Sequence, residues 1–254
     1  MLSIIGFIVL VVVLSSTIFS LKNVNLVFYS NTVKLTDKNE EIINSGNFKY
    51  NQSIFFINKQ KYIDNLERNS PYLKVINIET NFPNTLTINA LERNELFVIK
   101  TYQNNSFKNY AIVDDEFKIL NTTTSFVNSN SNPIIMNIEG VNFDALNLGE
   151  FLKSSEYDAL LNRLSNELLS YNNNVLLLKA NFAEINLNYE NKNNLLIKMH
   201  SGVEILLKDY SNKLESKFQL ALSYYDAQSP EKKEKGRITV FENNQQQIEG
   251  YYYS

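Results

Sequence analysis

The side chains best suited to acid–base or metal chemistry are few in this sequence and lie far apart. The single histidine, His200, precedes a Ser-Gly pair between two strand-like runs, a pattern typical of a turn. The acidic run at residues 114–116 lies between two short apolar runs and predicts a hairpin turn better than a metal site. Neither feature predicts a catalytic centre.

The composition also excludes several kinds of chemistry. The chain has no cysteine, which rules out disulfides, thiolate zinc sites and cysteine nucleophiles. Its seven glycines form no nucleophile elbow, dinucleotide loop or phosphate-binding loop. The net charge of −3 argues against a nucleic-acid partner. We therefore expect a non-enzymatic protein with no cofactor, no metal and no small-molecule substrate.

Glu92 and Arg93 form an acid–base pair at the end of a predicted strand. Adjacent residues of a strand point to opposite faces of the sheet, so the two side chains cannot line one pocket. We expect a structural ion pair with a neighbouring residue instead.

The element that must position everything else is the N-terminal segment, residues 1–21, which is rich in Leu, Ile, Val and Phe and carries no charge. About 20 residues at a helical rise of ~1.5 Å cover the ~30 Å core of a bilayer. A cleaved signal peptide is the alternative, but its apolar run is shorter and ends in a small-x-small site. We predict a transmembrane anchor with the N-terminus inside and all later residues on the other side.

The next part of the chain predicts a small α+β domain. A strand at residues 23–29 precedes a helix that begins after Thr36 and a second helix that begins at Asn58. Alternating residues then predict strands at 76–82 and 86–90, joined by a turn at Pro83. The order strand, helix, helix, strand, strand predicts a three-stranded sheet with two helices on one face.

These residues resemble the FtsQ/DivIB family of bacterial cell-division proteins. The family's POTRA domain shows a P-x-T-L-x-I-x-x-x-E-R pattern, followed by a hairpin of the form hydrophobic, Asp, Asp/Glu, x, Gly, x, hydrophobic. The first pattern is present here as Pro83, Thr85, Leu86, Ile88, Glu92 and Arg93, and the hairpin follows at residues 113–120. The departure is Phe117 in the place of the usual Gly, which predicts a different turn type.

A second unit begins with residues 97–102 and 110–120, the latter containing the hairpin turn, and a short strand is predicted at 134–138. Ser155 and Asp158 form a capping box before a leucine-rich helix. Strands are predicted at 175–181, 183–189, 195–199 and 203–208, a helix at 211–225, and a final strand at 237–241. This layout is similar to the β domain of the same family.

The fold class we expect is α+β, with a single N-terminal transmembrane helix, a β-α-α-β-β POTRA domain, and a mixed β domain with two helices. The expected boundaries are residues 1–21 for the anchor, 22–100 for the POTRA domain, 101–242 for the β domain, and 243–254 for a polar tail.

The resemblance implies a non-enzymatic, bitopic divisome protein of the cell membrane, with its C-terminal domains outside and its place at the division septum. Its partners would be the FtsB/DivIC-like and FtsL-like bitopic division proteins, and its role would link division-site assembly to septal peptidoglycan synthesis. The alternative is a POTRA-bearing envelope transport or chaperone module, which would show tandem POTRA repeats or a β-barrel.

The partner site we expect is the final strand. A terminal strand after a charged loop is expected at a sheet edge, where unpaired N–H and C=O groups can accept a strand from another chain. The family's use of this region supports the same position. The predicted partner-binding residues are Arg237, Ile238, Thr239, Val240 and Phe241.

Overall fold

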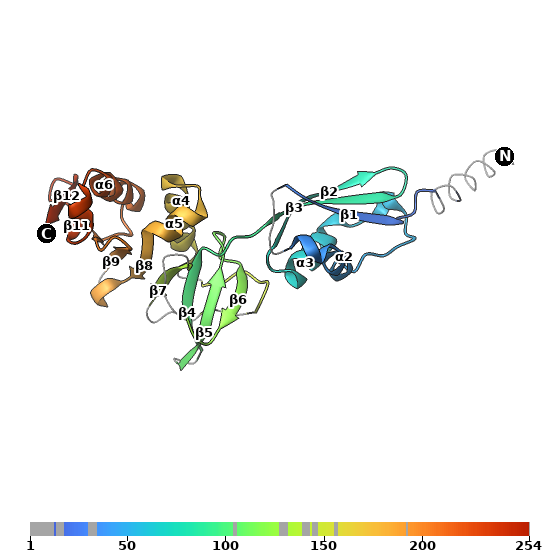
Figure 1. Ribbon diagram of the computed structural model, residues 1–254, viewed down its shortest axis with the longest axis horizontal. Helices are drawn as coiled ribbons and strands as arrows, with labels where there is room; N and C mark the ends of the chain where they lie inside the picture. Colours follow the sequence, from blue (N-terminus) through green and yellow to red (C-terminus); the bar gives the residue numbers. More distant parts are fainter. Residues whose placement is uncertain are drawn as a thin grey trace. The chain divides into compact units, whose positions relative to one another are not determined.

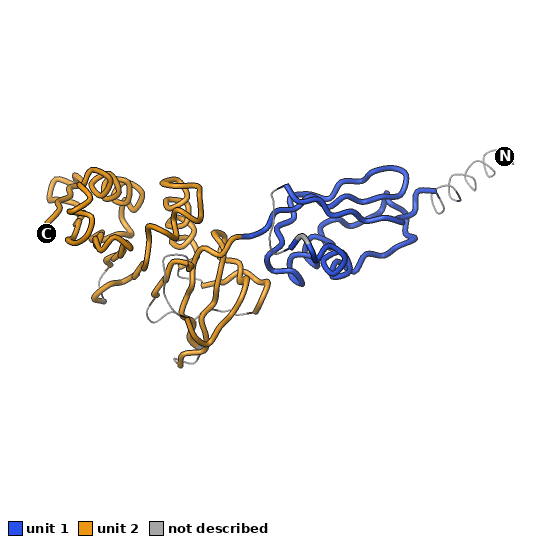
Figure 2. The backbone as a smooth tube through the Cα atoms, in the orientation of Figure 1, with its two compact units in different colours: residues 1–93 blue, residues 94–254 orange. Residues whose placement is uncertain are grey.

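The computed structural model of the chain describes residues 13, 18–29, 35–103, 106–126, 132–138, 143, 147–154, 157–191 and 193–253. It divides into two compact units, residues 1–93 and 94–254 (Figure 2). Most of the predicted anchor, residues 1–21, lies outside the described residues. The predicted end of the anchor is wrong, because Ser20 pairs with Ser53 and Leu21 is buried in the core of the first unit. Within the described ranges, no helix is both long and apolar enough to cross a bilayer.

The first unit has the predicted element order. Its strands are β1 (Asn23–Phe28), β2 (Leu73–Asn81) and β3 (Thr85–Glu92), and its α-helices are α2 (Asn39–Ser45) and α3 (Lys59–Asn69), with short 3-10 turns at Thr36–Lys38 and Ile54–Phe56. The sheet order is β1-β3-β2, with β1 parallel and β2 antiparallel to β3. Both helices lie on one face of this sheet (Figure 1).

The buried residues of the first unit recur at the spacing expected for a strand on β3 and for a helix on α3. Alternate residues Leu86, Ile88 and Ala90 of the central strand β3 are fully buried beneath the helices, as the period of two for a strand requires. On α3, Tyr62 and Leu66 are four residues apart and share the buried face. Each helix and strand thus contributes one apolar side.

The predicted ion pair at the end of β3 is present. The Arg93 guanidinium is buried and lies 3.1 Å from a carboxylate oxygen of Glu67 on α3. Its Nε also donates to the backbone carbonyl of Leu73 at 3.3 Å. Because the pair is buried and joins helix to sheet inside the unit, it is structural.

The second unit is built on one nine-stranded sheet with the order β12-β11-β10-β9-β8-β7-β4-β5-β6. Its strands are β4 (Phe97–Gln103), β5 (Ser106–Val113), β6 (Ile119–Thr123), β7 (Ile134–Ile138), β8 (Phe182–Leu187), β9 (Asn194–Met199), β10 (Glu204–Lys208), β11 (Arg237–Glu242) and β12 (Ile248–Tyr253). Its helices are α4 (Asp158–Tyr171), α5 (Val175–Asn181), α6 (Leu214–Asp226) and α7 (Pro230–Lys233), with a short 3-10 turn at Tyr189–Asn191.

The strand predicted at residues 175–181 is wrong, because these residues form the helix α5. The side-chain oxygen of Asn174 accepts a hydrogen bond from the backbone N–H of Leu176 at 2.9 Å and caps the helix. A short apolar run does not distinguish a helix from a strand by its period. The N-cap predicted at Ser155 lies outside the described residues, and α4 begins at Asp158.

The predicted boundaries between the parts also differ from the structure. Residues 97–100 belong to β4 and therefore to the large sheet, so the first unit ends at residue 93. The segment 243–254, predicted as a polar tail, contains the strand β12. With α5 and α7, the second unit has more than the two helices predicted.

The acidic run at 114–116 lies in the hairpin turn between β5 and β6, as predicted. A carboxylate oxygen of Asp114 accepts hydrogen bonds from the backbone N–H of Glu116 at 3.0 Å and of Lys118 at 2.8 Å. Phe117 adopts a φ of +61°, a left-handed conformation that favours Gly. Its ring is buried and stacks on Phe97 with a centroid distance of 5.3 Å, which explains why a large residue is tolerated there.

Candidate partner-binding edge

The predicted partner-binding residues, Arg237, Ile238, Thr239, Val240 and Phe241, all lie in β11. This strand is not at the sheet edge, because it pairs in parallel with β10 on one side and in antiparallel with β12 on the other. The prediction that β11 is an edge strand is therefore wrong. Its backbone groups are already used within the sheet.

The chain reverses after β11 through a turn that sequence reasoning missed. The side-chain oxygen of Asn243 accepts hydrogen bonds from the backbone N–H of Gln245 at 2.8 Å and of Gln247 at 3.0 Å. This is a side-chain-stabilised turn of the kind that Asn favours. The polar glutamines at 245–247 therefore mark a tight connection, and the chain returns as β12.

The edge strand of this end of the sheet is β12, and its pairing identifies the backbone groups that face outward. The backbone N–H of Asn243 donates to the carbonyl of Gln247 at 2.9 Å, so this pair is hydrogen-bonded. Hydrogen-bonded and non-hydrogen-bonded pairs alternate in an antiparallel ladder. By this alternation, the backbone N–H and C=O groups that face β11 are those of Glu249, Tyr251 and Tyr253. The backbone groups that face away from β11 are those of Ile248, Gly250 and Tyr252.

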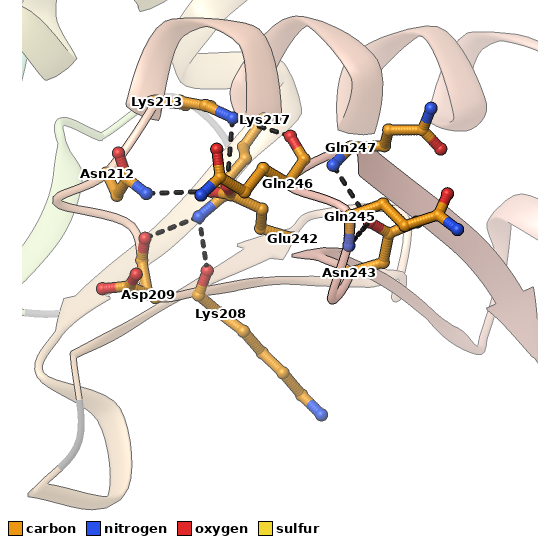
Figure 3. Close-up of polar contacts among 10 residues, drawn as sticks. All are labelled: Lys208, Asp209, Asn212, Lys213, Lys217, Glu242, Asn243, Gln245, Gln246 and Gln247. Atoms are coloured by element: carbon orange, nitrogen blue, oxygen red, sulfur yellow. Dashed lines mark hydrogen bonds and ion pairs between the residues drawn. The ribbon is translucent and has the colours of Figure 1, made fainter.

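Polar contacts hold the hairpin turn against the start of α6 (Figure 3). The Lys213 ammonium lies 3.0 Å from a carboxylate oxygen of Glu242 and donates to the backbone carbonyl of Gln246 at 2.8 Å. The side-chain amide of Asn212 donates to the other oxygen of Glu242 at 2.8 Å. Lys213 thus contacts both ends of the β11–β12 turn, and Asn212 adds a second contact at the end of β11.

A buried lysine fixes α6 to the neighbouring strand (Figure 3). The Lys217 side chain is fully buried, and its ammonium donates to the backbone carbonyls of Lys208 at 3.0 Å and Asp209 at 2.7 Å. Burial lowers the pKa of Lys217, because desolvation disfavours the charged form. The ammonium thus provides the hydrogen-bond donor for two backbone carbonyl groups at the end of β10.

The inner face of β12 packs on α6 and on the loop before β11. A Cβ atom at Gly250 would lie 3.2 Å from atoms of both Tyr224 and Val240, so glycine allows a close approach here. The Tyr252 hydroxyl lies 3.0 and 2.9 Å from the backbone carbonyls of Lys232 and Lys235. These contacts make β12 an ordered edge.

The outer face of the hairpin carries a row of aromatic rings. Phe241 and Tyr251 have a centroid distance of 6.0 Å, and Tyr251 and Tyr253 one of 5.8 Å. Beside them, the Arg237 guanidinium donates hydrogen bonds to the Glu204 carboxylate, which raise the pKa of Arg237. The edge therefore combines outward backbone groups with exposed aromatic side chains.

The structure gives no support for catalytic chemistry at the residues first considered. His200 lies in the turn between β9 and β10, where its backbone N–H donates to the carbonyl of Asn181 at 2.8 Å. Within the described parts of the chain, no group of three or more His, Cys, Asp or Glu side chains could hold a metal ion.

Comparison with known proteins identifies the first unit as a POTRA domain. The family model described as "POTRA domain, FtsQ-type" matches residues 34–93. The chain is also 26% identical to the cell division protein DivIB of Clostridium acetobutylicum over 180 residues, which cover 67% of this chain and 68% of the relative. A match to DivIB of Clostridium botulinum strain Hall is 26% identical over 210 residues and covers 81% of this chain and 74% of the relative.

These matches define the protein as one that carries an FtsQ-type POTRA domain. They confirm the resemblance to the FtsQ/DivIB family that the motif at residues 83–93 indicated, and they support a role in cell division.

Proposed function

We propose that this chain is a non-enzymatic, bitopic scaffold of the division septum. It binds FtsB/DivIC-like and FtsL-like proteins and links division-site assembly to septal peptidoglycan synthesis. The apolar N-terminal segment before Phe19 anchors it in the cytoplasmic membrane, and the folded residues that follow lie on the outer side. The observation that carries the proposal is the ordered, outward-facing edge of β12.

Strand addition is the binding mode that this edge supports. The outward N–H and C=O groups of Ile248, Gly250 and Tyr252 form a row that an extended segment of a partner can pair with. Each added hydrogen bond stabilises the complex by only about 0.5–1.5 kcal/mol. Side chains must contribute as well, and the exposed rings of Tyr251 and Tyr253 provide apolar area beside the edge.

The residues of β11 keep a narrower role in this proposal. Ile238, Thr239 and Val240 are buried and cannot contact a partner directly. Arg237 and Phe241 are half-buried. The Phe241 ring belongs to the aromatic row, and Arg237 lies beside Tyr253 at its other end. We propose that a partner strand on β12 reaches these two side chains and none of the three between them.

Strand addition at β12 can be tested with two substitutions of the same residue, Ile248. Ile248→Pro removes an outward-facing N–H at the first residue of β12, where Pro is compatible with an edge strand. Ile248→Ala removes the same side chain but keeps the N–H, and is the matched control. Binding of the full chain, in detergent, to the outer segment of its FtsB/DivIC-like protein should weaken up to about tenfold for the Pro variant and little for the Ala variant.

Circular dichroism and thermal melting must show that both variants are folded. If the folded Ile248→Pro variant binds with the affinity of the parent, strand addition at β12 is wrong. The wider role is tested by imaging a fluorescent fusion in dividing cells. A midcell band supports a septal scaffold, and an even peripheral signal contradicts it.

A further inference from the structure

The first unit carries a cluster of aromatic side chains of which only Phe19 packs against the core. Phe55, Phe56 and Phe82 are 54%, 86% and 61% exposed. The rings of Phe19, Phe55 and Phe82 contact one another, with centroid distances of 5.3, 6.2 and 5.4 Å. We call Phe19, Phe55, Phe56 and Phe82 the aromatic patch. Phe56 follows Phe55 in the 3-10 turn Ile54–Phe56. Exposed apolar surface of this kind marks an interaction site.

The aromatic patch lies where the apolar N-terminal segment enters the unit. The backbone N–H of Ile54 donates to the carbonyl of Phe19 at 2.7 Å, and the N–H of Leu21 donates to the carbonyl of Gln52 at 2.9 Å. On the other side, the N–H of Lys22 donates to the carbonyl of Asn84 at 2.8 Å. The chain is therefore held on both sides from Phe19 onward.

This attachment leaves no spacer between the predicted span and the patch. Residues 1–21 carry no charge, and the last of them are already hydrogen-bonded to the folded unit. A bilayer that contains this segment must have its surface close to Phe19. Phe55 and Phe82 then lie within the same layer, because both contact Phe19 directly. We expect the same of Phe56, which adjoins Phe55 in the chain and is the most exposed of the rings.

The charges that flank the patch residues in the sequence match an anionic membrane surface. Residues 47–63 include Lys49, Lys59 and Lys61 and no Asp or Glu, and Lys22 follows the apolar segment. Lys22, Lys49 and Lys61 are exposed. Aromatic side chains with nearby lysines are the combination that favours the interface of a bilayer.

We propose that the aromatic patch is a membrane-contact surface, which inserts Phe55, Phe56 and Phe82 into the interfacial layer of the bilayer that holds the apolar N-terminal segment. The inference rests on the membrane anchor of the proposed function and adds a second point of attachment. A span followed by a flexible linker lets a domain rotate freely, whereas a span with an adjoining inserted patch fixes which side of the domain faces lipid.

The absence of tryptophan from the sequence allows a direct measurement. Phe56→Trp places a single indole at the most exposed ring of the patch, with little loss of packing. Leu176→Trp, at a position in α5 that is 70% exposed, is the matched control. Each full-length variant is reconstituted into vesicles of phosphatidylcholine and phosphatidylglycerol, with and without brominated acyl chains.

We expect blue-shifted emission from Trp at position 56 and loss of most of that emission in brominated vesicles, while the control stays red-shifted and unquenched. Red-shifted, unquenched emission at position 56 overturns the proposal. Blue-shifted emission that brominated lipids do not quench also overturns it, because protein then covers the patch, either another part of this chain or a second copy.

Vesicle flotation separates this failure from failure of the anchor. If the protein does not float with the vesicles after alkaline extraction, the anchor is wrong and the membrane contact falls with it. If it floats and position 56 is unquenched, the anchor stands and only the membrane contact is wrong. Replacing Lys22 and Lys49 by Gln should reduce quenching at position 56, most clearly at low salt.

Discussion

The two sheets of this protein differ in the role of their most informative strand: it is a buried central strand in one and a half-exposed edge strand in the other. In the three-stranded sheet of the first unit, the central strand β3 supplies fully buried residues such as Ile88. In the nine-stranded sheet of the second unit, the edge strand β12 is half exposed and is held by contacts with its neighbours. A small sheet therefore concentrates its stability in one strand, whereas a large sheet can leave a terminal strand available for binding.

The strongest test of this contrast is Ile88→Ala. Truncating a fully buried Ile costs about 2–5 kcal/mol, a large part of the stability of a small domain. We expect the first unit to unfold at a much lower temperature while the second unit keeps its own transition. Calorimetry of the full chain measures both transitions.

The matched control for Ile88→Ala is Ile76→Ala, which removes the same side-chain atoms from an exposed position of β2. Its effect should stay within about 0.5 kcal/mol. Equal shifts of both transitions by Ile88→Ala would show that the two units unfold together and would contradict the contrast.

At the edge, the largest effect is expected from Gly236→Ala. Gly236 has a φ of +104°, and a Cβ atom there would lie 2.6 Å from the Tyr252 hydroxyl and 2.7 Å from the carbonyl of Tyr253. Strain of this kind costs on the order of 1–3 kcal/mol. Hydrogen exchange should become faster in β12 and stay slow in β8 and β9. Lys235→Ala, at the exposed neighbouring residue, should leave exchange unchanged, and uniform acceleration across the sheet would contradict a local edge.

The strands of the first unit could be predicted because each has its own sequence signal. Apolar residues alternate at Leu86, Ile88 and Ala90, and Asn58 caps the helix that follows it. These signals are local, so the order of elements and the buried face of β3 follow from the sequence alone.

The candidate edge could not be predicted in the same way. The run of three tyrosines at 251–253 has no alternation of polar and apolar residues, although its side chains alternate between the two faces of β12. Strand order depends on pairing between distant segments, such as β10 with β11, which no local pattern encodes. The Asn243 turn was the available signal, because Asn before a short polar run favours a reversal.

A smaller effect is expected from Lys217→Met, which keeps the buried stem but removes the ammonium. Two carbonyl groups at the end of β10 lose their donor, which is unfavourable. Part of this loss is offset because the charged group no longer has to be desolvated. We expect a net loss of about 1 kcal/mol, measured by denaturant unfolding. A gain in stability would show that the ammonium contributes nothing to holding α6.

The smallest effect concerns a surface ion pair between α4 and α6. Arg163 Nε and a carboxylate oxygen of Glu215 are 2.7 Å apart, with 41% and 44% of the two side chains exposed. Hydrogen bonding to Arg163 lowers the pKa of Glu215 to about 2. Because the folded pKa lies below the unfolded value of 4.5, the pair stabilises the fold above that value and loses its effect as the pH falls toward 2.

Exposure and salt screening limit this contribution to below about 1 kcal/mol. We expect the melting temperature of the parent to fall slightly more than that of Glu215→Gln across this pH window, and the difference to shrink at high salt. Glu234→Gln removes a carboxylate elsewhere on the same unit and controls for net charge. If both variants follow the parent equally, the pair does not stabilise the fold, and α6 is held against the sheet by its buried face and Lys217.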